Sequence, residues 1–334
     1  MERRLINVSD FPIIGSIAFG LIDRGTNLIQ VRPSSMCMLS CIFCSTDAGP
    51  KSSNRVSEYV VDLNVLIEGF REVVKFKGAY RIEAHIDTVG DPALYPRITD
   101  LIQELSSTRG VEVVSMQTHG YALTEEMIDD MAESGLSRIN LSIDALNPKT
   151  AVTLSGTEWY SVDRIKNIAE YIIKNTDIDL LIAPVWVPRY NDGEIPEIIK
   201  YGLKIGCGRK WPPFGIQKYE VHKYGRKPKN SRPISWFEFY SKLKQLEKIY
   251  NTKLILRKED FNIHPRRRIK YPFSVGEKLY VETIDYGWLK NEKLAIARDR
   301  VLTIVNADNI PLNVEVKVEI IRVKDNIIIA KPTI

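Results

Sequence analysis

Strand-like and helical stretches alternate from Leu28 to Glu220, and this alternation restricts the possible folds most strongly. A helical crossover after each short strand is typical of a parallel sheet. About six such units are too few for the eight of a closed (β/α) barrel, so we expect an α/β fold with a partial, open (β/α)6 barrel. The expected elements are strands 28–31, 81–87, 111–117, 138–143, 178–187, 214–220 and 253–256, and helices 62–76, 98–105, 124–134, 162–175, 194–205 and 236–250.

The chain has 334 residues, enough for one large and one small domain. Residues 1–27 suggest a lead-in or small sheet, residues 28–235 the partial barrel, and residues 236–272 a helical and basic connector. From residue 273 to residue 334, β-type runs with period-2 alternation are separated by turns. Such a pattern of short strands predicts a small closed β-barrel of OB-like character.

Composition places the chain among ordinary globular proteins, with 44% hydrophobic and 27% charged residues. No apolar run approaches the length of a membrane span, and the N-terminus lacks the apolar region of a signal peptide. We therefore expect a cytoplasmic protein without a membrane partner. Four cysteines in a chain of this length do not form a disulfide framework, and clustered cysteines in a reducing compartment favour a metal site or catalysis.

Three of the four cysteines, Cys37, Cys41 and Cys44, fall in one short segment after the first strand of the alternating region. Three thiolates leave one iron of a four-iron cluster without a protein ligand, and chemistry can occur at that iron. The alternative is a zinc site with Cys207 as fourth ligand, but zinc sites normally pair C-x2-C units, and this chain has no second pair.

The spacing Cys37-x3-Cys41-x2-Cys44 resembles the signature of the radical S-adenosylmethionine (radical SAM) superfamily. The resemblance covers roughly residues 28–225 at the level of the fold. It implies a [4Fe–4S] cluster on the three thiolates, SAM bound at the open iron, and cleavage of SAM to a hydrogen-abstracting 5′-deoxyadenosyl radical. It also implies that Phe43, the residue before the last cysteine, contacts the adenine of SAM.

A second segment, Val89-Gly90-Asp91-Pro92, follows the second strand and resembles the family's Gly-Gly-Glu-Pro segment, which receives the amino group of SAM. Glycine lets the backbone approach a ligand, and an acidic side chain suits an ammonium group. This sequence departs from the pattern, because Val89 replaces the first glycine and Asp91 replaces the glutamate. The alternative is an ordinary turn.

Three further strand ends supply polar candidates. The segment with Ser142 and Asp144 resembles molybdopterin-biosynthesis enzymes of the family, where such groups meet the carboxylate or ribose of SAM. Thr118 and His119 stand in the place of the family's Thr-Asn; Thr118 is a SAM-contact candidate, and His119 either lines the cavity as a catalytic candidate or caps a loop. Asn191 either contacts SAM or caps a helix.

Cys207 is the remaining cysteine, and the glycines on both sides of it suggest an exposed loop. We treat it as a second catalytic candidate, since a free thiol in a cavity can quench a radical, carry a methyl group or ligate a metal. The alternative is that Cys207 is a small buried hydrophobic residue.

The C-terminal segment, from Val275-Gly276-Glu277 to Ala330, looks like a TRAM domain, an RNA-binding module of several tRNA-modifying enzymes. Barrels of this kind bind looped or single-stranded RNA through a basic groove with aromatic stacking. The residues that would supply such a groove are Tyr280, Tyr286, Trp288, Lys278, Lys290 and Arg298.

The net charge is +5, and basic residues cluster in two tracts. We expect the first tract to leave the last strand of the partial barrel beside the mouth of the active site and to position RNA phosphates. The alternative is a solvated basic loop. The predicted RNA contacts are Arg209, Lys210, Lys218, Lys223, Arg226 and Lys227 in the first tract and Arg266, Arg267 and Arg268 in the second.

These features together favour a radical SAM enzyme that modifies RNA, specifically tRNA, by hydrogen abstraction from an unactivated carbon. The product is left open, and methylation of a nucleotide or of its amino-acid-modified side chain is one candidate. An electron donor such as ferredoxin or flavodoxin is implied. The alternatives are cofactor or small-molecule biosynthesis, a non-catalytic RNA-binding protein, and methylthiolation, which is disfavoured because residues 1–36 contain no cysteine for a second cluster.

Overall fold

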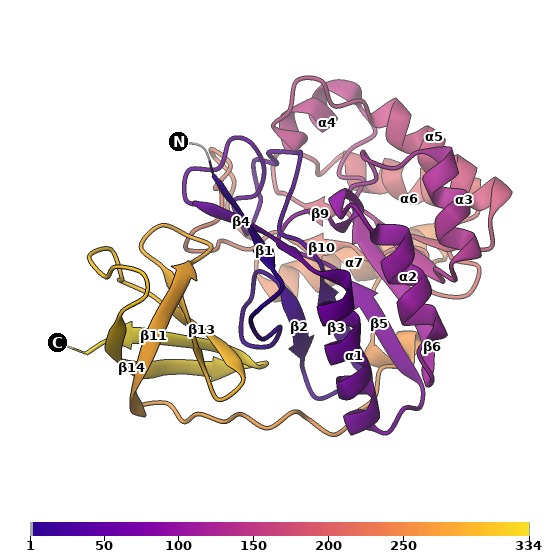
Figure 1. Cartoon of the computed structure of the whole chain (residues 1–334). Helices are drawn as coiled ribbons and strands as arrows, with labels where there is room; N and C mark the ends of the chain where they lie inside the picture. The colour runs from indigo at the N-terminus through magenta and orange to yellow at the C-terminus, as the bar shows by residue number, and fades with distance from the viewer. Residues whose placement is uncertain (1–2, 334) are drawn as a thin grey trace.

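A computed structural model describes residues 3–333, and its centre is a six-stranded sheet that curves into a partial barrel (Figure 1). All neighbouring strands in this sheet are parallel except the first pair, β2 and β3, which is antiparallel. In spatial order the strands are β2 (Gly20–Asp23), β3 (Leu28–Arg32), β5 (Ile82–Ile86), β6 (Val111–Thr118), β7 (Arg138–Leu141) and β8 (Asp179–Ile182).

Helices follow the strands and cover the outer face of the sheet, as the alternating pattern predicts (Figure 1). On β5, Ile82, Ala84 and Ile86 are buried in the hydrophobic core, whereas the residues between them point to the concave face. The sheet therefore has an apolar outer side and a polar inner side. The helices are α1 (Leu63–Lys77), α2 (Ile98–Ser107), α3 (Glu125–Glu133), α5 (Val162–Asn175) and α6 (Glu194–Ile205), close to the predicted ranges.

The last predicted strand of the partial barrel is present but interrupted. Residue Phe214 bridges Ile182 of β8, and β10 (Gln217–Lys218) pairs in parallel with β9 (Val185–Trp186). Pro184 lies between β8 and β9 and has no N–H to donate, although its carbonyl accepts from Gln217 N at 2.8 Å. The open (β/α)6 expectation thus holds, with an irregular sixth strand.

Several elements were not predicted. β1 (Arg4–Val8) pairs in parallel with β4 (Ser57–Val61), and a short helix α4 (Pro148–Ser155) and a 3-10 turn η1 (Pro92–Leu94) follow strand ends. The predicted strand at 253–256 is wrong. Two backbone N–H groups there, of Leu254 and Ile255, donate instead to the carboxylate of Glu247, each at 2.8 Å. That carboxylate lies in α7 (Trp236–Tyr250), so the apolar run folds back against the end of its own helix.

A closed five-stranded barrel forms the C-terminal part, as predicted from its alternating pattern. It has its own apolar core, separate from the core of the main sheet. The strands are β11 (Lys278–Tyr286), β12 (Lys293–Ala297), β13 (Arg300–Ile304), β14 (Glu315–Lys324) and β15 (Ile327–Pro332).

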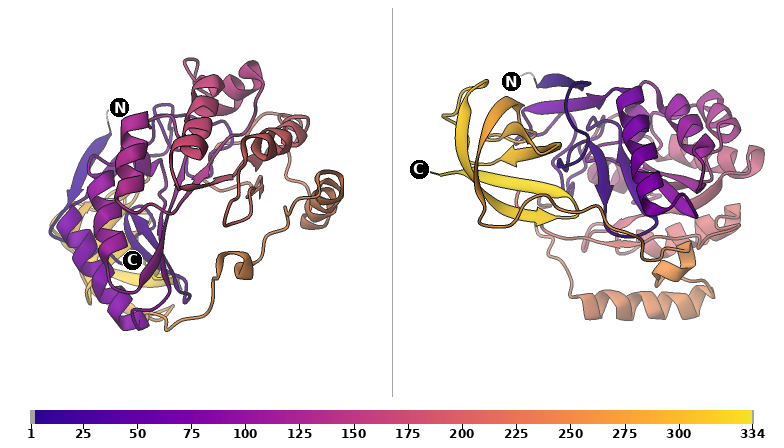
Figure 2. Two further views of the ribbon diagram at one scale, coloured as in Figure 1. Left: turned by 90° about the vertical axis from the view of Figure 1, so that its right-hand side faces the viewer. Right: turned by 60° about the horizontal axis from the view of Figure 1, so that its bottom comes forward.

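The C-terminal barrel is docked on the N-terminal strands (Figures 1 and 2). Val56 N donates to Trp288 O at 3.1 Å, and Lys290 N donates to Asn54 O at 2.8 Å. On the other side of the contact, Val301 N donates to Ile14 O at 2.9 Å. Backbone hydrogen bonds at both ends of the contact fix the barrel in one orientation.

This interface uses two of the aromatic residues predicted to stack on bases. The Trp288 ring lies 4.7 Å from the guanidinium carbon of Arg55, and the Tyr286 ring faces Arg4 at 3.7 Å and Lys293 at 4.5 Å. The prediction that Trp288 stacks on a base is therefore wrong, because its ring is buried in the interface, whereas the Tyr286 ring is half-buried. Of the three predicted aromatic residues, Tyr280 stays exposed.

The connector between the two domains runs from α7 through the 3-10 helix η2 (Lys258–Phe261) and back along the turn between β2 and β3. Asn27 N donates to His264 O at 3.0 Å, and Arg266 N donates to Gly25 O at 2.9 Å. Figure 2 shows α7 standing apart from the main helical layer. Within residues 3–333, no helix has the length and apolar character that crossing a bilayer requires.

Candidate active site

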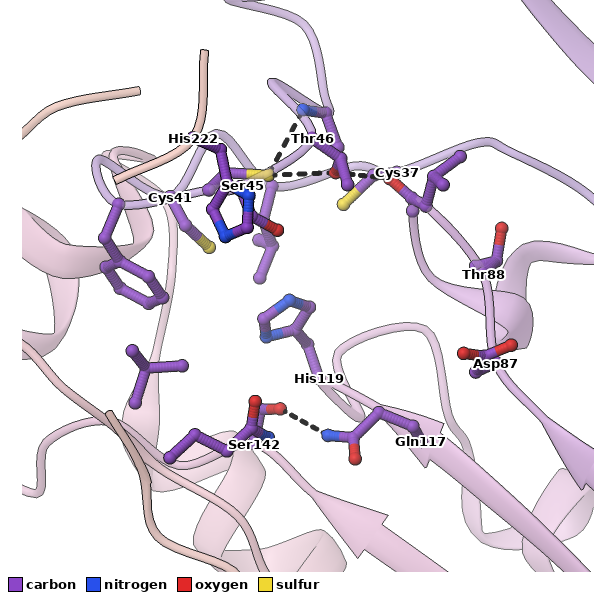
Figure 3. Close-up of a pocket in the computed structure, with 18 of the residues that line it drawn as sticks. Cys37, Cys41, Ser45, Thr46, Asp87, Thr88, Gln117, His119, Ser142 and His222 are labelled. Carbon is purple, nitrogen blue, oxygen red and sulfur yellow. Dashed lines mark hydrogen bonds between the residues drawn. The ribbon is translucent and has the colours of Figure 1, made fainter. Parts of the chain in front are cut away.

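The three clustered cysteines lie in the loop that leaves the carboxyl end of β3, and all three line one cavity of about 500 Å³ (Figure 3). The carboxyl ends of the parallel strands meet at this edge, which is where α/β folds place their sites. Besides the cysteines, the lining consists of Leu39, Phe43, Ser45, Thr46, Ala48, His85, Asp87, Thr88, Val89, Gly90, Gln117, His119, Ser142, Val185, Gln217, Lys218, Tyr219, Glu220 and His222.

The thiols sit in a protected environment. Burial raises the pKa of Cys37 to about 12 and that of Cys41 well above its usual range. Cys44 Sγ accepts from Ala48 N at 3.2 Å and lies 3.3 Å from Thr46 Oγ1. Within residues 3–333 no three Cys, His, Asp or Glu side chains are placed to hold a metal ion. The donor set of three thiols on one wall nevertheless fits an iron–sulfur cluster with one open iron.

The cysteine loop has no secondary structure of its own and is braced by Arg226. The Arg226 side chain donates to Cys41 O at 2.9 Å and pairs with Asp47 at 3.0 Å, and its backbone N donates to Cys44 O at 2.8 Å. We predicted Arg226 as an RNA contact from its place in a basic tract. The structure instead turns its guanidinium inward, where the carbonyl groups of the loop occupy it.

The segment after β5 forms the next wall of the cavity through Val89 and Gly90. A Cβ on Gly90 would lie 2.0 Å from Met36 O, so only glycine allows this close approach to the cysteine loop. Pro92 begins η1, directly behind this wall. The segment thus contributes backbone to the cavity, as the resemblance to Gly-Gly-Glu-Pro implies.

Asp91 does not face the cavity. Its carboxylate accepts from Thr118 Oγ1 at 2.7 Å, from Ala93 N at 3.1 Å and from His119 N at 3.2 Å. The side chain ties the ends of β5 and β6 together, and Thr118 is buried with it. The two predicted SAM contacts Asp91 and Thr118 are thereby placed behind the wall rather than on it.

The ends of β6 and β7 supply the polar floor of the cavity. Gln117 Nε2 donates to Ser142 Oγ at 2.9 Å, and His119 projects between this pair and the cysteines (Figure 3). Asp144 lies beside His119 in a smaller adjoining pocket, where its carboxylate accepts from Val185 N at 2.8 Å. Burial raises the pKa of Asp144 to about 6. Ser142 and His119 therefore both line the cavity, and contact of Ser142 with SAM stays a prediction.

Asn191 has neither of its two predicted roles. It is buried, its Oδ1 accepts from Val187 N at 2.8 Å, and its Nδ2 donates to Asp144 O at 2.8 Å. The N-cap of α6 is Gly193. Asn191 therefore joins the end of β7 to β9 and supports Asp144 from behind.

Sequence reasoning missed the inward-facing polar residues of β5 and its neighbours. His85 Nδ1 lies 2.8 Å from Ser115 Oγ, and burial lowers the pKa of His85. Asp87 accepts from Gln30 Nε2 at 2.7 Å and from Arg32 Nε at 3.1 Å. The alternation of polar and apolar residues in Ile82-Glu-Ala-His-Ile-Asp87 was the available signal.

Cys207, Arg209 and Lys210 lie at the opposite edge of the sheet. Asp179, the first residue of β8, accepts from Arg209 N at 2.9 Å and from Lys210 N at 2.8 Å. Cys207 is buried after the C-cap of α6, and burial raises its pKa to about 12. These residues precede the last strand, and a parallel strand begins at the far edge. The structure thus separates Cys207 from the cavity and corrects the expected position of Arg209 and Lys210.

The second basic tract also lies at this far edge. Arg266 Nη2 donates to Tyr80 O at 3.0 Å, Arg267 lies 4.2 Å from the Phe76 ring, and Arg268 Nη2 donates to Arg24 O at 2.8 Å. These side chains cannot reach a nucleotide in the cavity.

The remaining predicted RNA contacts are Lys218, Lys223 and Lys227. Lys218 and His222 line the cavity, but the Lys218 side chain is only 4% exposed and its Nζ pairs with Glu220 at 2.6 Å. Lys223 and Lys227 are exposed nearby in sequence.

Comparison with known proteins agrees with the geometry of the cysteine loop. The profile of the radical SAM superfamily matches residues 31–202. An uncharacterized protein of Methanocaldococcus jannaschii is 43% identical over 99% of this chain and 81% of its own length. GTP 3′,8-cyclase of Desulforamulus reducens is 30% identical over 38% of this chain and 37% of its own length.

Among solved structures, Streptococcus suis SuiB bound to S-adenosylmethionine matches with a TM-score of 0.51 at 19% identity. The match covers 73% of this chain and 48% of the SuiB chain. At this identity the likeness concerns the fold.

Replacing Gly90 by alanine tests the close approach of the two walls. The added methyl group cannot fit beside Met36 O, so Gly90→Ala should push the β5 end away from the cysteine loop. We expect lower iron retention after anaerobic reconstitution, measured as iron per chain. The matched control is Gly193→Ala, where a Cβ meets no atom within 4 Å. Equal iron content in both variants would contradict this account of the wall.

Proposed function

Because this chain belongs to the radical SAM superfamily, we propose that it is an RNA-modifying enzyme whose substrate is a tRNA. Its cofactors are a [4Fe–4S] cluster and SAM. Enzymes of this superfamily need a reductant, and we assign ferredoxin or flavodoxin to that role. The proposed reaction is hydrogen abstraction from an unactivated carbon of a nucleotide, with methylation as one candidate product.

Cys37, Cys41 and Cys44 would hold the cluster. When bound, the cluster with SAM supplies reductive cleavage and a hydrogen-abstracting radical. The chain's own residues bind and orient the ligands: Val89 and Gly90 form a close backbone wall, and the Gln117–Ser142 pair offers hydrogen bonds. The buried polar floor suits a ligand with many polar groups, such as a nucleoside.

An exposed aromatic surface next to the cavity mouth carries the RNA proposal. Phe237 is 85% exposed at the start of α7, and the rings of Trp236 and Tyr240 stack with centroids 5.7 Å apart. Lys218 Nζ lies 4.8 Å from the Trp236 ring centroid, and Lys218 also lines the cavity. Lys218 pairs with Glu220 and so links this surface to the cavity rather than offering a free charge. Exposed rings are how sequence-tolerant proteins hold unpaired bases.

The C-terminal barrel supports the proposal more weakly. Its identity as a TRAM domain remains our proposal, based on its position and its five-stranded closure. Tyr280 is exposed on β11, and Lys317 Nζ lies 5.5 Å from its ring centroid. This pair offers a second contact for a long RNA.

A second candidate is synthesis of a small molecule from a nucleotide. It is favoured by the partial match to GTP 3′,8-cyclase and by the polar cavity. The molybdopterin-biosynthesis enzymes carry a second cysteine cluster, and these 334 residues contain one further cysteine, Cys207. Cys207 lies at the far edge of the sheet, so the cysteines of this chain cannot form such a second cluster at the cavity.

Nucleoside mass spectrometry of tRNA from a deletion strain tests the proposed function. We expect one modified nucleoside to disappear and to return with the wild-type gene but not with Cys41→Ala, which removes a cluster ligand. An unchanged nucleoside profile would contradict the tRNA proposal and favour a small-molecule or protein substrate.

Phe237→Ala tests the aromatic surface. The side chain is 85% exposed, so its removal should leave the fold intact but weaken tRNA binding. Loss of one stacked base, worth about 1–3 kcal/mol, corresponds to at least about a fivefold rise in Kd. The slope of affinity against salt should stay unchanged, because no cation is removed. The control is Ile249→Ala, an exposed residue on the same helix. Equal Kd values in both variants would exclude base stacking here.

A further inference from the structure

Arg55 is buried between the cysteine loop, the β5 end and the C-terminal barrel. Its side chain is 0% exposed. Nη1 donates to Ser35 O at 2.7 Å, and Nε donates to Thr46 O at 3.0 Å. Ser35 precedes the first cluster cysteine and Thr46 follows the last, so one guanidinium spans both ends of the cysteine loop.

The same guanidinium reaches the opposite wall of the cavity. Nη2 donates to Thr46 Oγ1 at 3.1 Å and also to Val89 O. Thr46 Oγ1 in turn donates to Val89 O at 2.7 Å. The distance between the cysteine loop and the β5 end is therefore set by a shared set of hydrogen bonds. Arginine alone offers five donors in a fixed plane for such a task.

Trp288 of the C-terminal barrel covers the outer side of Arg55. The guanidinium carbon lies 4.7 Å from the ring centroid, and Arg55 forms an antiparallel bridge with Leu289. A stacked ring attracts the cation and also keeps water from it. The barrel thus closes the environment of a charge that lies inside the main domain.

The charge of Arg55 is only partly compensated. Glu58 lies 3.2 Å from Arg55 Nη1, but the same carboxylate pairs with Arg3 at 2.6 Å and accepts from Ser35 Oγ at 2.5 Å. Two cations share one carboxylate, so a net positive charge remains. Arg55 Nη2 donates to Thr46 Oγ1 at 3.1 Å, and the same hydroxyl lies 3.3 Å from Cys44 Sγ, so a single hydroxyl group separates the guanidinium from a cluster thiol.

We propose that Arg55, covered by Trp288, is a positioning residue that fixes the spacing of the two cavity walls and holds a positive charge beside the cluster. Through this contact the C-terminal barrel sets the reduction potential of the centre. A nearby buried cation stabilises the more negative, reduced cluster and so raises its potential. The inference depends on the cluster and not on the RNA proposal.

The test uses full-length protein reconstituted anaerobically. Its midpoint potential is measured by redox titration monitored by electron paramagnetic resonance, and its iron content and SAM affinity are measured alongside. Arg55→Met should shift the midpoint potential to a more negative value. Arg55→Lys keeps the charge but loses the planar donor set, so it should retain the potential and bind SAM about tenfold more weakly. Arg71→Met, an exposed arginine on α1, is the control.

If Arg55→Met loses its cluster, its midpoint potential cannot be measured, and the variants Trp288→Leu and Trp288→Phe then test the proposal. Leucine removes the aromatic cover, so the potential should move in the same direction as in Arg55→Met, whereas phenylalanine should behave like the wild type. Midpoint potentials equal to that of the wild type in Trp288→Leu, or in an Arg55→Met protein with full iron content, would overturn the proposal. None of these readouts involves RNA, so the proposed function can fail independently.

Discussion

The structure depends on holding three cysteine thiols, one buried and two half-buried, in a loop that has no helix or strand of its own. Such a loop cannot be ordered by local hydrogen bonds and needs partners that are distant in sequence. Arg226 supplies them from beyond β10, Arg55 joins the two ends of the loop, and Gly90 lets the β5 end approach to a distance that any other residue would prevent. The cluster site is thus built by long-range contacts.

The inner face of the sheet gives this loop a polar counterpart. Glu83 and His85 alternate with apolar residues along β5, Asp87 follows the strand, and each of the three forms hydrogen bonds with a neighbouring strand. Buried polar groups are costly unless they are paired, so this network is stable and also ready to orient a polar ligand. The cavity therefore has cysteine thiols on one wall and polar side chains that can form hydrogen bonds on its floor.

Local pattern was enough to predict the helices α1, α2, α3, α5, α6 and α7, the strands of the partial barrel and the closed C-terminal barrel, but not α4 or the β1–β4 pair. The resemblance to the superfamily predicted Cys37, Cys41, Cys44, Phe43 and Ser142 as site residues, and all five line one cavity at the edge where the carboxyl ends of the parallel strands meet. Local pattern failed for Cys207 and Arg209. Both residues precede a strand, so they lie at the edge of the sheet opposite the cavity, whereas residues that follow a strand lie at the cavity edge. It also failed for Arg226, Asp91 and Trp288, since charge and aromaticity in sequence do not reveal an inward partner. Arg55 gave no local signal at all.

The central claim is that the cysteine loop is a working radical SAM centre. The most direct measurement is the yield of 5′-deoxyadenosine when anaerobically reconstituted protein is given SAM and a strong reductant. The account predicts 5′-deoxyadenosine formation that depends on Cys41 and is lost in Cys41→Ala, but is unaffected in Cys207→Ala because that thiol lies at the far edge of the sheet. Full iron content with no 5′-deoxyadenosine, or loss of the product in Cys207→Ala, would contradict it.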